Sequence, residues 1–223
     1  MYRQFCNRKG FDPHAELNDI KQIPPVAVSV FKNLGYGLAS VPKEDIKLRL
    51  QSSATSGTPS TVVVDKITSK RQAKAMVKVM QEFIGKDRKP FLVMDIDPRS
   101  EFRSLLGARF AAITGYLNFA SKSGFFLKAK NGVSYFDIDA ITEYMTTIPS
   151  DQPVVVFGFT YIMYSNVLKA ILAKGEKIQL PKGSKIIHIG GWKKLEAEKV
   201  EKSLFNQQLA DGFGIEPTDV IDI

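Results

Sequence analysis

The sequence of 223 residues is poor in the side chains that build disulfides and metal sites. It contains one cysteine, Cys6, so no disulfide can form within the chain, and its two histidines, His14 and His188, lie far apart. Structural metal sites need several such ligands at close spacing. We therefore expect no metal site built from protein side chains, and we expect Cys6 to be a bystander thiol without a partner histidine.

The sequence also lacks a long uninterrupted apolar stretch. A membrane-spanning helix needs about 20 such residues, and no run in the sequence approaches that length. The first residues, MYRQFCNRKGFDPHAEL, are charged and aromatic, without the apolar centre of a secretory signal. These absences predict a cytoplasmic protein without a membrane partner.

Acidic residues are outnumbered, with 23 Asp and Glu against 31 Lys and Arg, for a net charge of +8. Such an excess is typical of nucleic-acid-binding proteins. However, Arg71, Lys74 and Lys78 fall on one face of a predicted helix, and Met76 and Met80 fall on the other. This distribution favours a solvated helix and no nucleic-acid partner, although a basic surface around an anionic small ligand would give the same total.

Short apolar runs alternate with helical periodicity from Thr61 onward, which predicts an α/β protein with a mostly parallel sheet flanked by helices. Strands are expected at 61–65, 90–97, 124–130, 153–159, 184–191 and 219–223. Helices are expected at 69–84, from Pro98 to 120 with Asp97 as cap, and at 136–148, 161–175 and 193–214. Residues 1–50 show no long period, so we expect them to be irregular.

The carboxyl ends of parallel strands form the rim at which such sheets bind ligands. Residues 157–160 and 188–192 are expected at this rim, as is any segment that follows Ile223. In HIGGWKK, two glycines let a ligand lie against bare backbone, and Trp192 offers either a flat face for a base or an apolar body for the core. His188 has the same two interpretations, a core histidine or a ligand-facing one. Phe157, Phe159 and Tyr161 indicate an apolar pocket, although aromatic residues after a buried strand more often belong to the core.

The stretch SSATSGTPS, residues 52–60, gathers small hydroxylated residues before a strand. It is either a flexible connection or a loop whose hydroxyls and amides wrap a polyphosphate. It lacks the Lys-Ser/Thr pair of the common GxxxxGK[ST] phosphate loop, which disfavours that nucleotide-binding fold.

The stretch VMDIDPRS places Asp95 and Asp97 at a strand end, as in enzymes that form an aspartyl-phosphate. Helix capping by Asp97 explains the same pattern. Aspartyl-phosphate chemistry at Asp95 is therefore a third hypothesis.

Several stretches together resemble the LuxE-type acyl-protein synthetases, a branch of the adenylate-forming ligases. They are YRQFCNRKGFDP, IPPVAVSVFK, SSATSGTPS, GYLNFAS, PVVVFGFTYIMY and, most specifically, HIGGWKKLEAEKVEKSLFNQQLADGFG leading into DVIDI. The resemblance implies the core of the large N-terminal domain of adenylate-forming enzymes. We expect a single adenylation core over residues 1–223, with an irregular part at 1–50 and strand–helix repeats at 51–223.

The resemblance implies that ATP and a carboxylic acid, here a fatty acid, give an acyl-adenylate, and that the acyl group then passes to a thiol. It implies Mg²⁺ on the phosphates and an acyl-reductase or another thiol acceptor protein as partner. The implied phosphate-binding residues are Ser52, Ser53, Thr55, Ser56, Gly57 and Thr58, and the implied adenine site is Gly190, Gly191 and Trp192. We assign catalytic roles to Thr55 and His188, and the acyl pocket to Phe157, Gly158 and Phe159.

This sequence departs from the family pattern in three places. Ala54 stands where the family loop has glycine, and Ser60 stands where many relatives have lysine. The family continues beyond the position of Ile223 with a Tyr-Gly-x-Thr-Glu motif and a small C-terminal lobe, so we expect an incomplete ligase core. The alternative is a non-catalytic nucleotide-binding or scaffold module. In the ligase hypothesis, Thr55 and Trp192 form opposite walls of one nucleotide cleft.

Overall fold

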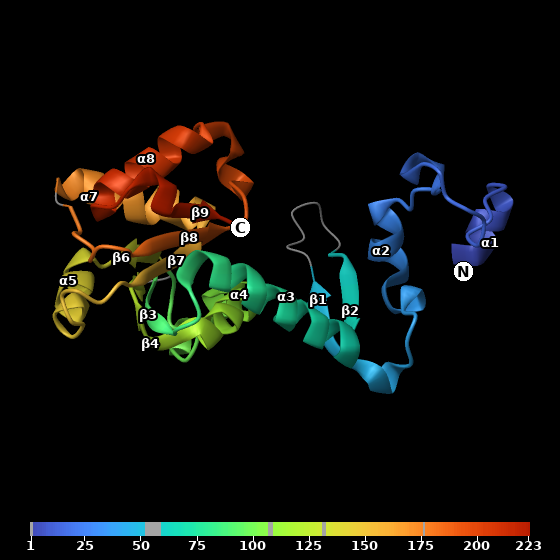
Figure 1. Cartoon of the computed structure of the whole chain (residues 1–223), viewed down its shortest axis with the longest axis horizontal. Coiled ribbons are helices and arrows are strands. Elements are labelled where there is room, and N and C mark those ends of the chain that lie inside the picture. The colour runs from blue at the N-terminus through green and yellow to red at the C-terminus, as the bar shows by residue number, and fades with distance from the viewer. Residues whose placement is uncertain (1, 52–58, 107–108, 131–132, 176) are drawn as a thin grey trace. The chain divides into compact units, whose positions relative to one another are not determined.

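The computed structural model describes residues 2–51, 59–106, 109–130, 133–175 and 177–223 (Figure 1). Its Cα positions divide the chain into two compact units, Met1–Lys78 and Val79–Ile223. The division falls inside one helix, α3 (Lys66–Ile84). A single adenylation core over residues 1–223 stays a prediction.

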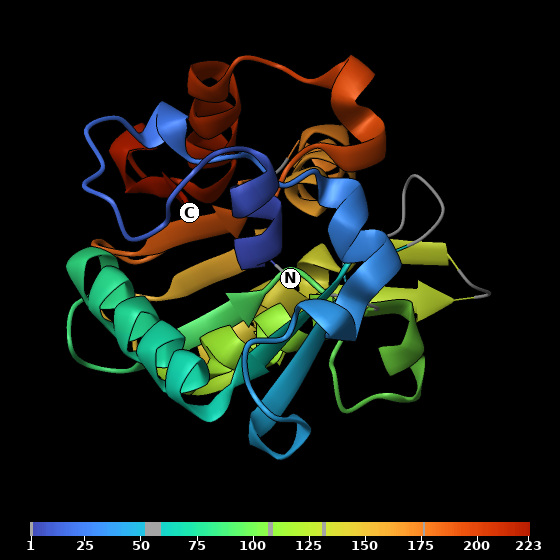
Figure 2. The same cartoon turned by 90° about the vertical axis from the view of Figure 1, so that its right-hand side faces the viewer.

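The first unit contains more regular structure than the sequence indicated. Its elements are α1 (Tyr2–Arg8), η1 (Ile20–Gln22), α2 (Val28–Leu34), η2 (Gly35–Leu38), η3 (Lys43–Asp45), β1 (Ile46–Gln51) and β2 (Thr61–Asp65). Helices α1 and α2 are drawn in blue in Figure 2. The expectation that residues 1–50 are irregular was therefore wrong for both helices and for β1.

Strands β1 and β2 form an antiparallel pair in which Gln51 lies opposite Thr61. Leu48 and Leu50 alternate with charged residues, which is the period of a strand. Strand β2 belongs to this hairpin and not to the parallel sheet, because its only strand partner among the described residues is β1.

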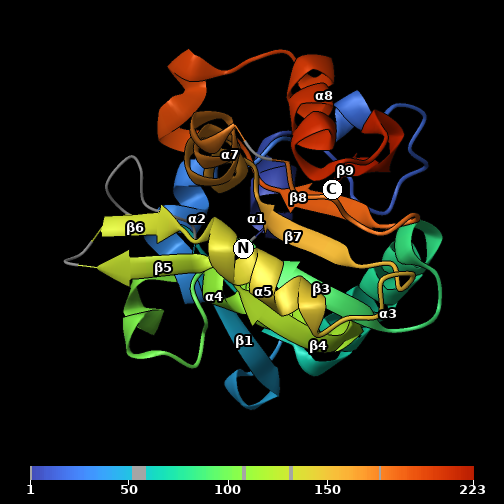
Figure 3. The same ribbon diagram turned by 90° about the vertical axis from the view of Figure 1, so that its left-hand side faces the viewer.

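The second unit is built on a five-stranded sheet in the order β4-β3-β7-β8-β9 (Figure 3). Its strands are β3 (Lys89–Val93), β4 (Ala120–Phe125), β7 (Val155–Phe159), β8 (Lys185–Ile189) and β9 (Val220–Asp222). All neighbouring pairs are parallel. The predicted α/β class with a parallel sheet is confirmed.

The connections of the second unit are mostly helical. They comprise η4 (Glu101–Leu106), α4 (Arg109–Tyr116), η5 (Leu117–Phe119), α5 (Ile138–Thr146), α6 (Thr160–Ile162), η6 (Met163–Leu168), α7 (Lys169–Lys174), η7 (Lys193–Glu198), α8 (Lys202–Phe213) and η8 (Pro217–Asp219). The segment η6 is a π-helix that joins α6 to α7. Helices α7 and α8 lie together on one side of β8 and β9 (Figures 1 and 3).

Three predicted elements differ from the structure. No helix begins at Pro98, because the Asp97 carboxylate accepts from the Arg99 backbone and side chain and closes a turn. The predicted strand 124–130 divides at Phe126 into the end of β4 and the start of a hairpin, β5 (Leu127–Lys130) and β6 (Val133–Phe136). The predicted helix 193–214 is interrupted before Lys202, where Lys199 and Glu201 have extended ψ angles.

The core of the second unit is centred on β7, in which every residue is buried. Strands covered on both faces carry continuous apolar runs. Phe157 stacks on Tyr116 with ring centroids 4.3 Å apart. Gly158 points to the opposite face, where a Cβ atom would lie 2.6 Å from Met163 Sδ and 3.1 Å from Met94 Cβ. The glycine therefore lets helix and sheet approach closely at this point.

We expect Gly158→Ala to destabilise the second unit by about 1–3 kcal/mol, because the added methyl group overpacks a site between two buried methionines. Urea unfolding followed by the fluorescence of Trp192, the single tryptophan, measures the change. Gly115→Ala is the matched control, since a Cβ there meets no atom within 4 Å. Equal midpoints for the two variants would contradict the packing argument.

Candidate functional site

The order of the strands places a switch point at the centre of the sheet. Strand β4 lies on one side of β3, whereas β7, β8 and β9 follow on the other side. Ligands of open parallel sheets bind at such a reversal, outside the carboxyl ends of the strands. Strands β7 and β8 are paired through Gly158 and His188, and through Phe159 and Ile189. The two loops that the sequence analysis assigned to the rim are therefore neighbours.

A threonine hydroxyl joins these two loops. Thr160, which is 4% exposed, follows β7 and begins α6. Its Oγ1 lies 2.8 Å from the Gly190 carbonyl oxygen and 3.0 Å from His188 Nδ1. A hydroxyl has a single proton, so the shorter contact assigns that proton to the Gly190 carbonyl, and Oγ1 accepts from Nδ1. The turn after β8 is thereby tied to the start of α6.

His188 is enclosed on every side. Its side chain is 2% exposed, and Nε2 has no hydrogen-bond partner among the described residues. Burial lowers the pKa of His188, and the Asp222 carboxylate and the Asn206 side chain oppose this shift. The ring is thus neutral near pH 7. This geometry supports a positioning role for His188, because the buried ring does not reach a ligand at the surface.

The turn at Gly190 combines an exposed backbone with a buried side chain. Gly190 has a φ of +78°, which favours glycine. A Cβ on Gly191 would meet no atom within 4 Å. Trp192 is 8% exposed and packs edge-on against Tyr164 and Phe205, at centroid distances of 4.8 and 5.4 Å. The indole supports the turn from the core side, and adenine binding by these three residues stays a prediction.

The residues assigned to the acyl pocket lie within the sheet. Phe157 and Phe159 are buried on one face with ring centroids 6.2 Å apart, and Gly158 is buried on the other. Tyr161 follows them, with its ring centroid 6.5 Å from that of Phe159. Phe157 and Phe159 pack in the core, Tyr161 is half-buried, and acyl binding by these residues stays a prediction.

A buried ion pair at the end of β3 was not found by sequence reasoning. The Asp95 carboxylate accepts from Arg109 Nε at 2.8 Å and from Nη2 at 3.1 Å, and Arg109 Nη1 donates to the Tyr161 hydroxyl at 2.6 Å. Burial raises the pKa of Asp95, and Arg109 opposes this shift. Because Arg109 occupies both oxygens, the arrangement disfavours an aspartyl-phosphate. The sequence contains one signal for this ion pair: a carboxylate at the end of a buried strand requires a neighbouring cation.

The predicted phosphate loop cannot be placed. Ser52, Ser53, Thr55, Ser56, Gly57 and Thr58 lie outside the described residues. The strands that flank them, β1 and β2, form a hairpin, so the segment is the connection between two antiparallel strands. Phosphate binding by these residues, and catalysis by Thr55, stay predictions.

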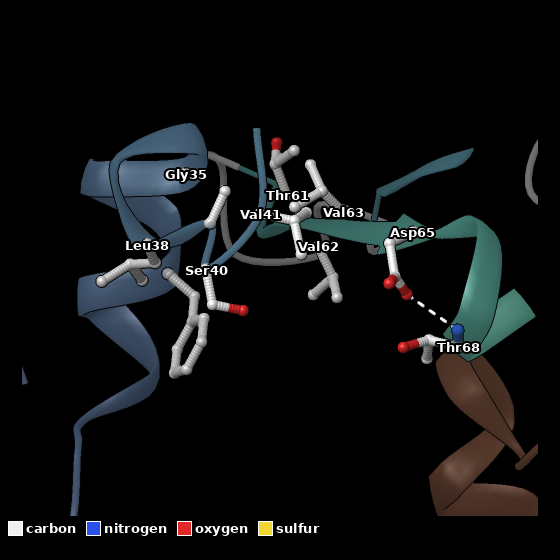
Figure 4. Close-up of a pocket in the computed structure, with 11 residues that line it drawn as sticks. Gly35, Leu38, Ser40, Val41, Thr61, Val62, Val63, Asp65 and Thr68 are labelled. Atoms are coloured by element: carbon white, nitrogen blue, oxygen red, sulfur yellow. Dashed lines mark hydrogen bonds between the residues drawn. The ribbon is translucent and has the colours of Figure 1, made fainter. Parts of the chain in front are cut away.

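A pocket in the first unit, of about 220 Å³, lies beside β2 (Figure 4). Its lining includes Gly35, Val41, Thr61 and Asp65. The Asp65 carboxylate accepts from the Thr68 backbone N–H at 2.8 Å and thus caps the start of α3. None of the lining residues is basic, so this pocket is unsuited to a polyphosphate.

None of the helices in the described ranges has the length and apolar character needed to cross a bilayer. Within the same ranges, no group of three or more His, Cys, Asp or Glu side chains could hold a metal ion.

Comparison with known proteins yields one family and one fold. The family model described as "Acyl-protein synthetase, LuxE" matches residues 1–223. The long-chain-fatty-acid–luciferin-component ligase of Vibrio harveyi is 25% identical over 228 residues, which cover 99% of this chain and 56% of that protein.

Solved structures of a 2-hydroxyisobutyryl-CoA ligase share the fold. The open conformation in complex with 2-HIB-AMP and CoA has a TM-score of 0.59 at 13% identity, and the match covers 99% of this chain and 44% of that one. The thioesterification state has a TM-score of 0.60 at 14% identity, with 99% and 43% covered. This chain spans about half the length of these relatives. The predicted resemblance and fold class are confirmed.

We expect the second unit to lose stability as the pH falls below about 6.5. The pKa of His188 is lower in the folded state, so only the unfolded state takes up the proton in this range. The free energy of unfolding then decreases by up to about 1.4 kcal/mol per pH unit until the folded-state pKa is reached.

His188→Asn removes this dependence, whereas the matched variant His14→Asn, at an exposed position, retains it. Urea unfolding between about pH 5 and 7, followed by Trp192 fluorescence, measures both slopes. An unchanged slope in His188→Asn would contradict the assignment.

Proposed function

Because the chain belongs to the LuxE acyl-protein synthetase family, we propose that it forms the nucleotide-binding core of an acyl-adenylate-forming ligase. A carboxylate oxygen of the acid attacks the α-phosphorus of ATP, and the bond to pyrophosphate breaks. A thiol then attacks the acyl carbon, and AMP leaves. The acid is a fatty acid, in line with the long-chain-fatty-acid ligase of Vibrio harveyi that this chain resembles.

The observation that carries this proposal is the fixed, exposed turn at Gly190 and Gly191. It lies after β8 at the carboxyl-end rim of a parallel sheet, where ligands of such sheets bind. Thr160 holds the Gly190 carbonyl oxygen at 2.8 Å, and the space around Gly191 is open. A planar base can therefore lie against backbone that needs no rearrangement on binding.

His188 and Thr160 act on this site by positioning. The buried neutral imidazole donates through Nδ1 to Oγ1, and Oγ1 donates to the Gly190 carbonyl. Trp192 fixes the end of the same turn through Tyr164 and Phe205. Preorganised groups of this kind lower the cost of ordering the ligand and the turn together.

The phosphates of ATP are assigned to the hydroxyl-rich segment that contains Ser53, Thr55 and Thr58. Amides and hydroxyls would stabilise the charge that develops as pyrophosphate leaves. Mg²⁺ enters with ATP, because it binds phosphate oxygens readily and keeps several water ligands. The thiol acceptor is carried by a partner protein, an acyl-reductase in the family resemblance.

We expect ATP with Mg²⁺ to raise the melting temperature and Gly191→Leu to abolish most of this protection. The leucine side chain would occupy the open space over the turn without disturbing the core. A tenfold loss of affinity removes about 1.4 kcal/mol of ligand stabilisation at saturating ATP. Gly115→Ala, in α4, is the control that retains the protection. Equal protection in both variants would refute the adenine assignment.

Thr55→Val tests the phosphate loop, because it removes a hydroxyl and keeps the shape of the side chain. We expect weaker ATP binding with an unchanged melting temperature in the absence of ATP, measured by calorimetry and thermal unfolding. If the unmodified protein releases no binding heat with ATP, the chain is a scaffold module and the ligase proposal fails.

A further inference from the structure

A groove in the first unit combines a mostly apolar lining with positive charge. Its volume of about 720 Å³ lies within the range of about 300–1,000 Å³ that is typical of small-molecule sites. The groove is lined by α1, by the segment 24–27 and by α2 with the end of η2 (Figure 1). Its apolar lining includes Phe5, Pro25, Val26, Val30, Leu34 and Leu38.

Helix α1 separates the aromatic and the charged parts of this lining. Tyr2, Phe5 and Arg8 follow one another at intervals of three residues, so their side chains lie on the same side of the helix. The six residues from Tyr2 to Arg8 rise about 9 Å along the helix axis. The aromatic rings and the guanidinium group therefore belong to opposite ends of this wall.

Two prolines make the segment 24–27 suited to an apolar ligand. The Tyr2 hydroxyl donates to the Pro24 carbonyl oxygen at 3.3 Å and thus connects α1 to this segment. Pro24 and Pro25 have no backbone N–H. A hydrocarbon that covers them leaves no donor of these two residues unpaired, which avoids the usual cost of covering a polar group.

Arg8 and Lys9 are the charged residues of the described lining, which contains no acidic residue. Among the described residues, neither of the two has an ion-pair partner. Lys9 also lines a neighbouring pocket that contains Asp12 and Glu16, so Arg8 is the cation that we assign to the groove. An unpaired cation at one end of an apolar groove favours a ligand with a long apolar tail and an anionic head.

Other exposed apolar side chains of α2 do not belong to the groove. Val28 and Phe31 are 66% and 38% exposed, and Phe31 lines the smaller pocket beside β2. Single exposed apolar side chains are ordinary in folded proteins. The groove differs from them because its apolar side chains surround one hollow that also has a cation at one end.

We propose that this groove binds a long-chain fatty acid, with the alkyl tail between α1 and α2 and the carboxylate at Arg8. A guanidinium group can donate two parallel N–H bonds to a carboxylate. The choice of acid rests on the proposed function, in which a fatty acid is activated. The aromatic residues of β7 do not offer such a surface, because Phe157 and Phe159 pack in the core of the second unit.

The first test compares four ligands on the unmodified chain without ATP, by calorimetry below their micelle concentrations. Dodecanoate has both the tail and the carboxylate, dodecanol lacks the charge, acetate lacks the tail, and dodecyl phosphate changes the head group. We expect dodecanoate to bind tightest, dodecanol up to about fivefold more weakly, and acetate not at all. Equal binding of dodecanol, or tighter binding of dodecyl phosphate, would overturn the assignment to a fatty acid.

Leu34→Glu places a carboxylate beside the tail and should weaken dodecanoate binding about tenfold or more, because apolar contact is lost. Leu204→Glu is the matched control, since Leu204 lies in α8 and is 49% exposed, against 43% for Leu34. It should retain binding. Equal losses in the two variants would overturn the proposal.

Arg8→Gln separates the head group from the tail. We expect it to weaken dodecanoate binding up to about fivefold and to leave dodecanol binding unchanged. Arg3→Gln, at an exposed position of the same helix outside the lining, should change neither. Unchanged dodecanoate binding in Arg8→Gln would overturn the carboxylate assignment.

A dodecanoate analogue with a photoreactive diazirine in its tail locates the site directly. After irradiation and peptide mass spectrometry, we expect labels within residues 2–38, whereas labels confined to residues 79–223 would overturn the proposal. So would a dimer that Leu34→Glu dissociates, because a second copy would then cover the groove. ATP protection should be unchanged in Leu34→Glu, so a failure here is distinguishable from a failure of the ligase proposal.

Discussion

One hydroxyl group holds the candidate site together. Thr160 lies where β7 becomes α6, and its Oγ1 contacts the carbonyl oxygen of Gly190 and the ring of His188 across the β7–β8 pair. Parallel pairing only brings two loops to the same edge of a sheet. The hydroxyl fixes the conformation of the turn after β8, in which the Gly191 backbone faces outward and the Trp192 indole faces inward. The proposed nucleotide site depends on this contact.

A second cluster of buried polar side chains lies at the neighbouring part of the same rim. Asp95 lies just after β3, and Arg109 connects it to Tyr161, which follows β7. The two groups therefore lie at the ends of three adjacent strands, β3, β7 and β8. Most buried polar side chains make hydrogen bonds within the protein, and here these bonds connect the loops that follow the three strands. Such fixed groups are what the proposed adenylation would require, because the acid and the phosphate must be oriented for attack.

The periodicity of apolar residues was sufficient to predict the strands of the parallel sheet. It was not sufficient to predict the turns and side-chain contacts around them. Continuous apolar runs such as 153–159 identify covered parallel strands, and the glycine at 175, with a φ of +68°, ends α7 as predicted. The ion pair of Asp95 with Arg109 joins residues 14 positions apart, which no local pattern encodes. The Asp97 turn and the break before Lys202 arise where one side chain or backbone contact overrides helix propensity. Trp192 had two interpretations, and only its neighbours Tyr164 and Phe205 indicate the buried one.

Because of the π-helix at Met163–Leu168, the orientation of the side chains that follow depends on the number of residues in this stretch. A π turn holds one residue more than an α turn, so every later side chain is rotated by about 100° from its place in a continuous α-helix. Ile171 owes its position beside Gly212 to this offset, since its Cγ2 lies 3.3 Å from where a Cβ on that glycine would be. Removal of one residue from this stretch would therefore turn Ile171 away from Gly212 and change the face through which α7 contacts α8.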